Sequence, residues 1–181
     1  FIGQEEAGIY EAAAKTAMLA SLFLTAVSAT AAPMIASLHG RGDHASLQGI
    51  VTSATRWMWF PSLVIALGLI FLASPILGLF GPVFAEGRWA LRLLALGQLI
   101  NASTGPVGYL MGLTGYQNLS ARVFGITAMV NIVLNATFIP IWGLEGAALA
   151  TMGTTILWNV WLYILIKKHL GIRSFVFSTV R

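Results

Sequence analysis

Residues 105–124, GPVGYLMGLTGYQNLSARVF, are apolar enough to lie in a membrane, yet they are rich in residues that weaken a helix. Glycine frees the backbone, and Pro106 lacks a hydrogen-bond donor and clashes with the preceding turn. In a lipid-embedded bundle, neighbouring helices and cavity water can satisfy the backbone groups that such residues release. The stretch therefore predicts a membrane helix with a break at Pro106.

The composition of the whole chain indicates the same solvent. Apolar residues make up 57% of the 181 residues, charged residues make up 9%, and the mean hydropathy is +0.83. A soluble domain carries about 25% charged residues. The alternating short strands of a transmembrane barrel are not seen. The chain is therefore expected to be an all-α integral membrane protein, with residues 1–181 forming a single membrane domain.

Five segments reach the length of about 20 mostly apolar residues that a spanning helix needs. They are residues 9–38, 54–80, 89–113, 119–139 and 144–166. The second of them has only Ser62 and Ser74 as polar residues besides glycine and proline after Trp57, so we expect it to face lipid. The pattern predicts a polytopic bundle of about five transmembrane helices.

Charged residues divide between the two ends of this bundle. One side would hold Arg41, Arg56, Arg122, Lys167, Lys168, Arg173 and Arg181, and the other Glu5, Glu6, Glu86, Arg88, Arg92 and Glu145. By the positive-inside rule, the C-terminus is expected to be cytoplasmic and the N-terminus outside. The basic residues are spread over helix ends, which argues against a nucleic-acid partner. The opening FIGQEEAGIY lacks the features of a signal peptide, and we interpret it as the outer end of a helix that belongs upstream.

A face of small residues follows the third apolar segment. Spacings of three or four residues place successive positions on one side of a helix. Positions with these spacings are Gly97, Asn101, Gly105, Gly108, Gly112 and Gly115. We expect one continuous face with almost no side chain, where helix backbones approach closely or slide. Static packing and a moving gate with its break at Pro106 both remain open.

Polar side chains recur every third or fourth residue in four of the five segments, and such groups are costly in hydrocarbon without a partner. The positions are Ser21, Thr25, Ser28, Gln98, Asn101, Thr127, Asn131, Asn135, Thr151, Thr155 and Asn159. These faces indicate half the wall of a water-accessible cavity. The candidates for the substrate path are Gln98, Asn101, Asn131, Asn135 and Asn159. Interhelical hydrogen bonding alone would also explain each stripe.

Two cations complete the list of candidates. Lys15 follows Glu11 by four residues, the favourable order for an intrahelical pair, and a structural pair is one reading of it. The other reading is that Lys15, as a point charge, and Arg92, as a bidentate fork, bind a phosphate-bearing substrate. Arg92 could equally extend to lipid headgroups.

No catalytic or metal-binding motif is present in a usable form. Residues 39–44, HGRGDH, are interpreted as a solvated loop, because no helix or strand holds its histidines together. The sequence lacks GxxxxGK[ST], HExxH, GxSxG and any cysteine. We expect no enzymatic activity, no cofactor and no metal.

Several runs of residues carry a family resemblance. They include AGIYEAAAKTAML at 7–19, APMIASLHGRGD at 32–43, LRLLALGQLINASTGPVGYLMGLTG at 91–115 and NIVLNATFIPIWGLEGAALAT at 131–151. In this order and spacing the chain resembles the C-terminal lobe of polysaccharide flippases of the multidrug/oligosaccharidyl-lipid/polysaccharide transporter superfamily. The resemblance implies a two-lobed, MATE-like protein, with this chain as the second lobe lacking its first helix.

The resemblance also implies a function. Members of the family move undecaprenyl-pyrophosphate-linked oligosaccharide across the bacterial cytoplasmic membrane for surface polysaccharide assembly, by alternating access between two lobes. The implied partners are membrane lipid, this lipid-linked glycan and the missing N-terminal lobe. Two alternatives remain open: a multidrug or lipid II exporter of the same superfamily, and a non-transporting membrane fragment or assembly partner.

Overall fold

The structure, a computed structural model, describes residues 3–178, so Arg181 and both chain ends lie outside the described residues. Within this range every regular element is a helix, and none is a strand. Three helical stretches are long and apolar enough to cross a membrane: Gln4–Gly40, His44–Phe71 and Gln117–Leu170. The prediction of an all-α membrane protein is confirmed.

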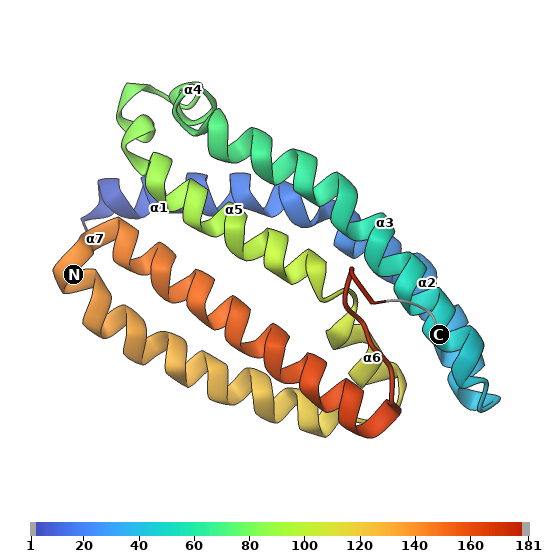
Figure 1. The fold of residues 1–181 in the computed structure, drawn as a ribbon. Coiled ribbons are helices and arrows are strands. Elements are labelled where there is room, and N and C mark those ends of the chain that lie inside the picture. The colour runs from blue at the N-terminus through green and yellow to red at the C-terminus, as the bar shows by residue number, and fades with distance from the viewer. Residues whose placement is uncertain (1–2, 179–181) are drawn as a thin grey trace.

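The first stretch consists of three consecutive elements. They are α1 (Gln4–Ala17), the 3₁₀ turn η1 (Met18–Ser21) and α2 (Leu22–Gly40). Together they contain 37 residues, or about 55 Å at 1.5 Å per residue, which exceeds the roughly 30 Å of a bilayer's hydrocarbon core. Figure 1 shows α1 and α2 running along the whole length of the bundle.

The second helix, α3 (His44–Phe71), begins ten residues before the expected start at residue 54 and ends well before residue 80. Its start is set by Asp43, whose carboxylate accepts a hydrogen bond from the Ser46 backbone N–H at 3.0 Å. This bond holds the pKa of Asp43 below its usual range. Hydropathy missed the first turns of α3 because they are polar. The start of the helix is set instead by the hydrogen bond that the Asp43 side chain accepts.

Beyond Phe71 the chain turns at the end of the bundle. The short helix α4 (Ala73–Gly78) and the 3₁₀ helix η2 (Pro82–Gly87) fill this turn. Two further helices, α5 (Arg88–Ser103) and α6 (Val107–Leu113), occupy the segment expected at 89–113. The predicted break separates α5 from α6, with Gly105 at φ +72° next to Pro106.

The longest element, α7 (Gln117–Leu170), is two helices joined at Gly143, whose φ of 54° and ψ of −128° are not helical. Figure 1 shows that the two halves run antiparallel from this reversal. The halves correspond to the segments expected at 119–139 and 144–166. A Cβ on Gly146 would overlap the Phe138 carbonyl, so a residue without a side chain lets the halves meet closely here.

Buried residues show that α3 is more than a lipid-facing helix. It contributes Leu47, Val51 and Met58, each fully buried, to the main hydrophobic cluster, and it is the most buried of the three long stretches. The expectation that residues 54–80 face lipid is therefore incomplete, because one side, with Trp57, Val64 and Phe71, is exposed, whereas the other, with Met58, is buried. Apolar residues pack against protein as readily as against lipid, so the scarcity of polar residues does not distinguish the two environments.

The backbone groups released at the break between α5 and α6 are bonded again by nearby groups. The hydroxyls of Ser103 and Thr104 donate to the carbonyls three residues earlier, at 2.7 and 2.9 Å. The Val107 N–H donates to the Gly105 carbonyl at 2.9 Å, and the Val176 N–H donates to the Ser103 carbonyl at 3.0 Å. The sequence can break a helix inside the bundle because these donors replace the lost helical bonds.

Val176 belongs to residues 171–178, which fold back from the end of α7 onto the bundle (Figure 1). The Gln48 side-chain amide donates to the Arg173 carbonyl at 3.0 Å and accepts from the Arg173 N–H at 2.8 Å. Ile172, Ser174 and Val176 are buried in alternation. This extended segment therefore joins α3, α7 and the end of α5.

We predict that Gly105→Ala destabilises the protein by about 2 kcal/mol or more, since backbone strain and overpacking each cost this order of energy. An added Cβ would overlap the Thr55 hydroxyl, and the positive φ of Gly105 disfavours any side chain. Gly112→Ala is the matched control, because a Cβ there meets nothing within 4 Å in α6. Thermal unfolding in detergent checks both variants, and equal midpoints would contradict the close approach of α3 to the break.

Candidate functional site

The two predicted phosphate ligands each have a local partner. The Lys15 ammonium lies 2.7 Å from a Glu11 carboxylate oxygen, and both side chains are exposed. The Arg92 guanidinium lies 4.5 Å from the centroid of the Trp89 ring, and its Nε donates to the Ile70 carbonyl at 3.0 Å. Lys15 and Arg92 therefore each contact residues of their own surroundings, and they do not line one common site.

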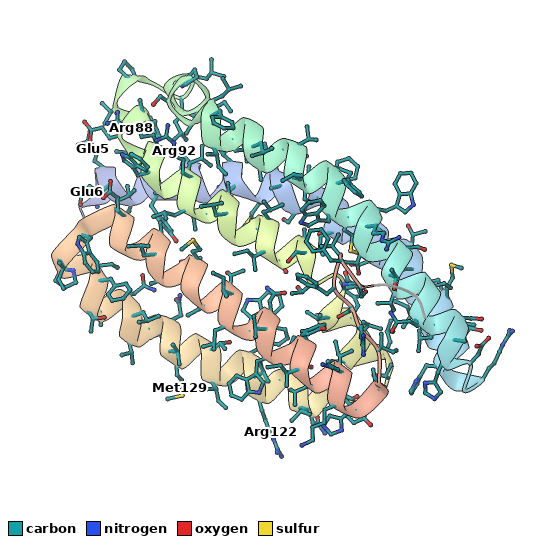
Figure 2. The ribbon with its side chains drawn as sticks, in the orientation of Figure 1. Glu5, Glu6, Arg88, Arg92, Arg122 and Met129 are labelled. Atoms are coloured by element: carbon teal, nitrogen blue, oxygen red, sulfur yellow. The ribbon has the colours of Figure 1, made fainter. Side chains whose placement is uncertain are left out.

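Arg92 lies with Arg88 at one end of the bundle. Figure 2 shows these arginines at the same end as Glu5 and Glu6. The helix ends that carry Arg41 and Lys167 lie toward the opposite end (Figure 1). Acidic residues therefore accompany the cations at the first end, which lowers the positive charge that an anionic ligand would meet there.

The glycines do not form the expected continuous face, because the break turns α6 away from the line of α5. A Cβ on Gly97 would touch Met152 at 3.4 Å, and Gly105 lies against Thr55. A Cβ on Gly112 or Gly115 would meet nothing within 4 Å. Close packing thus occurs at the α5 end of the series and fades after the break.

Two predicted amides bond to each other and across the two halves of α7. The Asn131 Nδ2 donates to the Thr154 hydroxyl at 3.0 Å. The Asn135 Nδ2 donates to the Asn131 side-chain oxygen at 2.9 Å. Both asparagines are half-buried, so each combines an interhelical or intrahelical bond with some accessible surface.

A second set of polar contacts joins other helices to the second half of α7. The buried Thr104 hydroxyl lies 2.7 Å from Asn159 Oδ1 and ties the end of α5 to this half. The Tyr10 hydroxyl lies 2.9 Å from the Thr151 hydroxyl and ties α1 to it. Sequence analysis missed Tyr10 and Thr104, although a phenol in an apolar helix usually requires a partner.

The remaining pair of predicted residues lies beside the helix break. Asn101 is 9% exposed, and its Nδ2 donates to the Gln98 side-chain oxygen at 3.2 Å. Asn101 also lines a cavity of about 140 Å³ between α2, the break, α6 and both halves of α7. The wall includes Thr25, Ser28, Asn101, Pro106, Phe124 and Trp158.

This cavity differs chemically from the polar contacts around it. The Ser28 hydroxyl is fully buried and has no hydrogen-bond partner among the described residues. The rings of Phe124 and Trp158 pack with their centroids 5.3 Å apart on another wall. No charged residue contributes to its lining. The site can therefore offer hydroxyl and amide groups beside aromatic surface, but it cannot neutralise a charge.

The described part of the chain contains no cluster of metal-binding side chains. No group of three or more histidine, cysteine, aspartate or glutamate side chains that could hold a metal ion lies among residues 3–178. The polar candidates are amides and hydroxyls, which bind by hydrogen bonding.

We predict that Thr104→Val destabilises the bundle by about 1–2 kcal/mol, because it leaves the fully buried Asn159 oxygen without its donor. Thr137→Val is the control, since the Thr137 hydroxyl is exposed and bonds only to carbonyls of its own helix. Reversible unfolding in detergent measures both. A double-mutant cycle with Asn159→Leu should give a coupling energy above zero, and additivity would exclude the contact.

Comparison with known proteins places the chain in a family of membrane proteins. The family model MatE matches residues 1–137. The probable low-salt glycan biosynthesis flippase Agl15 of Haloferax volcanii is 24% identical over 156 residues, covering 83% of this chain and 32% of that protein. The probable flippase AglR of the same organism is 29% identical over 158 residues, covering 84% of this chain and 33% of that protein.

A third relative, the uncharacterised membrane protein MJ1375 of Methanocaldococcus jannaschii, is 27% identical over 147 residues, covering 79% of this chain and 34% of that protein. The chain thus spans about a third of the length of these relatives. No solved structure matches it. Because the family model covers most of the chain, the protein belongs to the MatE family.

Proposed function

We propose that this chain forms part of a transporter that flips a lipid-linked oligosaccharide across the membrane in which it resides. The observation that carries the proposal is membership of the MatE family together with similarity to two proteins named as flippases, one of them for glycan biosynthesis. The bundle supplies what a sugar headgroup needs. Amides and hydroxyls recur along helices whose remaining surface suits lipid.

The proposed substrate is a polyprenyl pyrophosphate that carries a glycan, with undecaprenyl as the lipid in a bacterial cytoplasmic membrane. The relatives come from archaea, so undecaprenyl and the bacterial membrane are expected from the family resemblance alone. The pyrophosphate requires cations and the glycan requires hydrogen-bonding groups. The neutral polar groups of this chain suit the glycan portion, and a partner lobe would supply further charge.

A second lobe is part of the proposal. The chain spans about a third of the length of its relatives, and alternating access requires two bodies that rock about a shared site. The first half of α7 presents large apolar side chains outward, including Met129, which is 70% exposed (Figure 2). Lipid or an N-terminal lobe would cover this surface.

The assignment of individual residues to the substrate path remains a prediction. It concerns the cations Lys15 and Arg92 and the amides Gln98, Asn101, Asn131, Asn135 and Asn159. A gating role for Gly97, Gly105, Pro106, Gly108, Gly112 and Gly115 also remains a prediction. Among these residues, Asn101 lines the cavity at the break, and this position makes it the strongest candidate.

Transport by the complete protein tests the proposal. Proteoliposomes would contain the transporter and a polyprenyl-pyrophosphoryl oligosaccharide, and an added glycosidase would remove only glycan that reaches the outer leaflet. We expect the transporter to bring inner-leaflet glycan within reach of the enzyme, whereas protein-free liposomes do not. Export of a fluorescent drug or of lipid II without movement of the oligosaccharide would favour those substrates. Movement of none of them would identify a non-transporting protein.

We predict that Asn131→Ala combined with Asn135→Ala lowers transport per molecule several-fold while the protein still reaches the membrane. The loss of Asn131 leaves the Thr154 hydroxyl satisfied, since this hydroxyl also donates to the Ala150 carbonyl at 2.9 Å. Membrane abundance by immunoblot and transport in proteoliposomes check the two quantities separately. A fall in abundance that accounts for all lost transport would assign these amides to packing alone.

Membrane orientation gives another prediction. From the charge distribution and the positive-inside rule, we expect the loop at Gly42 to be cytoplasmic and the turn at Glu86 to be outside. Both residues are exposed and lie outside the long helices. A single cysteine at Glu86 should react with a membrane-impermeant thiol reagent in intact cells, whereas a cysteine at Gly42 should react only after lysis. The opposite labelling pattern would show that the protein has the opposite orientation in the membrane.

A further inference from the structure

We propose that the cavity at the helix break binds one uncharged sugar residue of the transported glycan. This inference rests on the proposed function, which it deepens by locating the glycan and by separating its site from that of the phosphate. The cavity lies between α2, the junction of α5 and α6, and both halves of α7. Four features of the cavity indicate its ligand: an unpartnered hydroxyl, the absence of charged residues from the lining, an aromatic wall and a small volume.

The Ser28 hydroxyl is the first indication of a ligand. It is fully buried, and no described group bonds to it. A serine in a helix can usually bond to a carbonyl of the preceding turn, as Thr16 does at 2.7 Å. A buried hydroxyl without a partner costs about 1–3 kcal/mol. A ligand hydroxyl in the cavity would remove this cost.

Asn101 supplies a second polar group on the same wall. Its Nδ2 is engaged by Gln98, whereas no residue of the described chain donates a hydrogen bond to its Oδ1. Asn101 thus has acceptor capacity left, and the Ser28 hydroxyl can both donate and accept. This combination matches the hydroxyl groups of a sugar, each of which is both donor and acceptor.

The charge of the cavity excludes the phosphate. No arginine, lysine or histidine lines the wall, and no aspartate or glutamate does either. Burying an unpaired phosphate or ammonium in such a site would carry a large desolvation cost. The ligand is therefore uncharged, and the pyrophosphate of the same substrate must lie elsewhere.

The aromatic wall and the volume narrow the ligand further. Phe124 and Trp158 form a tilted pair beside the cavity, and Tyr109 adds a third ring. The C–H faces of a pyranose pack well against such rings. The volume of about 140 Å³ is below the roughly 300–1,000 Å³ of pockets for drug-sized ligands. It suits a single sugar residue better than a whole oligosaccharide or a drug.

Protection of a cysteine at Thr25, an exposed residue of the cavity wall, from alkylation tests the proposal. The described residues contain no cysteine, so the Thr25→Cys variant is made in the complete transporter after any other cysteines are replaced. A small neutral thiol reagent is applied with polyprenyl pyrophosphate that carries a neutral hexose or N-acetylhexosamine, or with the same lipid without sugar. Thr30→Cys, exposed on the same helix, is the control.

We expect the sugar-bearing lipid to slow alkylation at position 25 but not at position 30, and the sugar-free lipid to slow neither. Equal protection by both lipids would show that phosphate or lipid occupies the cavity and would overturn the proposal. Transport of the sugar-bearing lipid without any protection would overturn it while leaving the proposed function intact. Absence of transport would refute the proposed function, and the assignment of this cavity with it.

A second pair of variants separates binding from folding. Ser28→Ala removes the unpartnered hydroxyl, so we expect thermal stability that is equal or higher, together with an apparent KM for the sugar-bearing lipid about five- to tenfold higher, the usual effect of one lost hydrogen bond. Ser62→Ala removes another fully buried, unpartnered hydroxyl in α3. It should likewise not lower thermal stability, and it should leave the KM unchanged. Equal KM effects from both variants would contradict a sugar site at Ser28.

Discussion

A backbone that leaves its helix inside lipid must find new hydrogen-bond partners, because the surrounding hydrocarbon offers none. In this protein that requirement arises between Ser103 and Val107, where glycine and proline interrupt the third apolar segment. Hydroxyls of the last turn of α5 satisfy two of the released carbonyls. The backbone of Val176 satisfies another, so the segment after α7 is held to the end of α5 by the same need.

Two other helices, α3 and α7, contact the residues of this break. Thr55 of α3 approaches the backbone where Gly105 has no side chain, and Asn159 of α7 bonds to Thr104. Each contact joins a separate helix to the junction, so the interruption of one helix specifies the positions of its neighbours. The cavity beside the junction is lined by residues 105–109 of the break and of α6, together with residues of α2 and α7.

Sequence reasoning found the parts of this fold that depend on composition and on backbone-breaking residues. Hydropathy identified the apolar helical stretches, although only three of those among the described residues are long and apolar enough to cross a membrane and the count of about five spans stays a prediction. Pro106 located the break correctly. The start of α3 was missed because it depends on the Asp43 cap rather than on apolar residues. The reversal at Gly143 could not be read as a sharp turn, since many glycines in this chain lie within helices and lack such a conformation.

The polar candidates show a similar limit. Periodicity placed Asn131 and Asn135 on one side of a helix, and they do bond to each other. It could not show that Thr154 and Thr104 would be the partners of the asparagines, because such pairs depend on which helices meet. Nor could spacing distinguish the unpartnered Ser28 from Thr25, whose hydroxyl lies 3.4 Å from a carbonyl of its own helix.

The first half of α7 is bounded by Gly115 and Gly143, which both have positive φ and open space where a Cβ would lie. Between Thr127 and Gly146 no described residue is fully buried. Over this stretch the helix is held mainly by the Asn131–Thr154 hydrogen bond and by the close approach of Phe138 to Gly146, so a change in its tilt would break few contacts. The helix α5 is followed instead by Gly105, which lies against Thr55. The first half of α7 is therefore the part of the bundle that a change of shape would move before it disturbed the break.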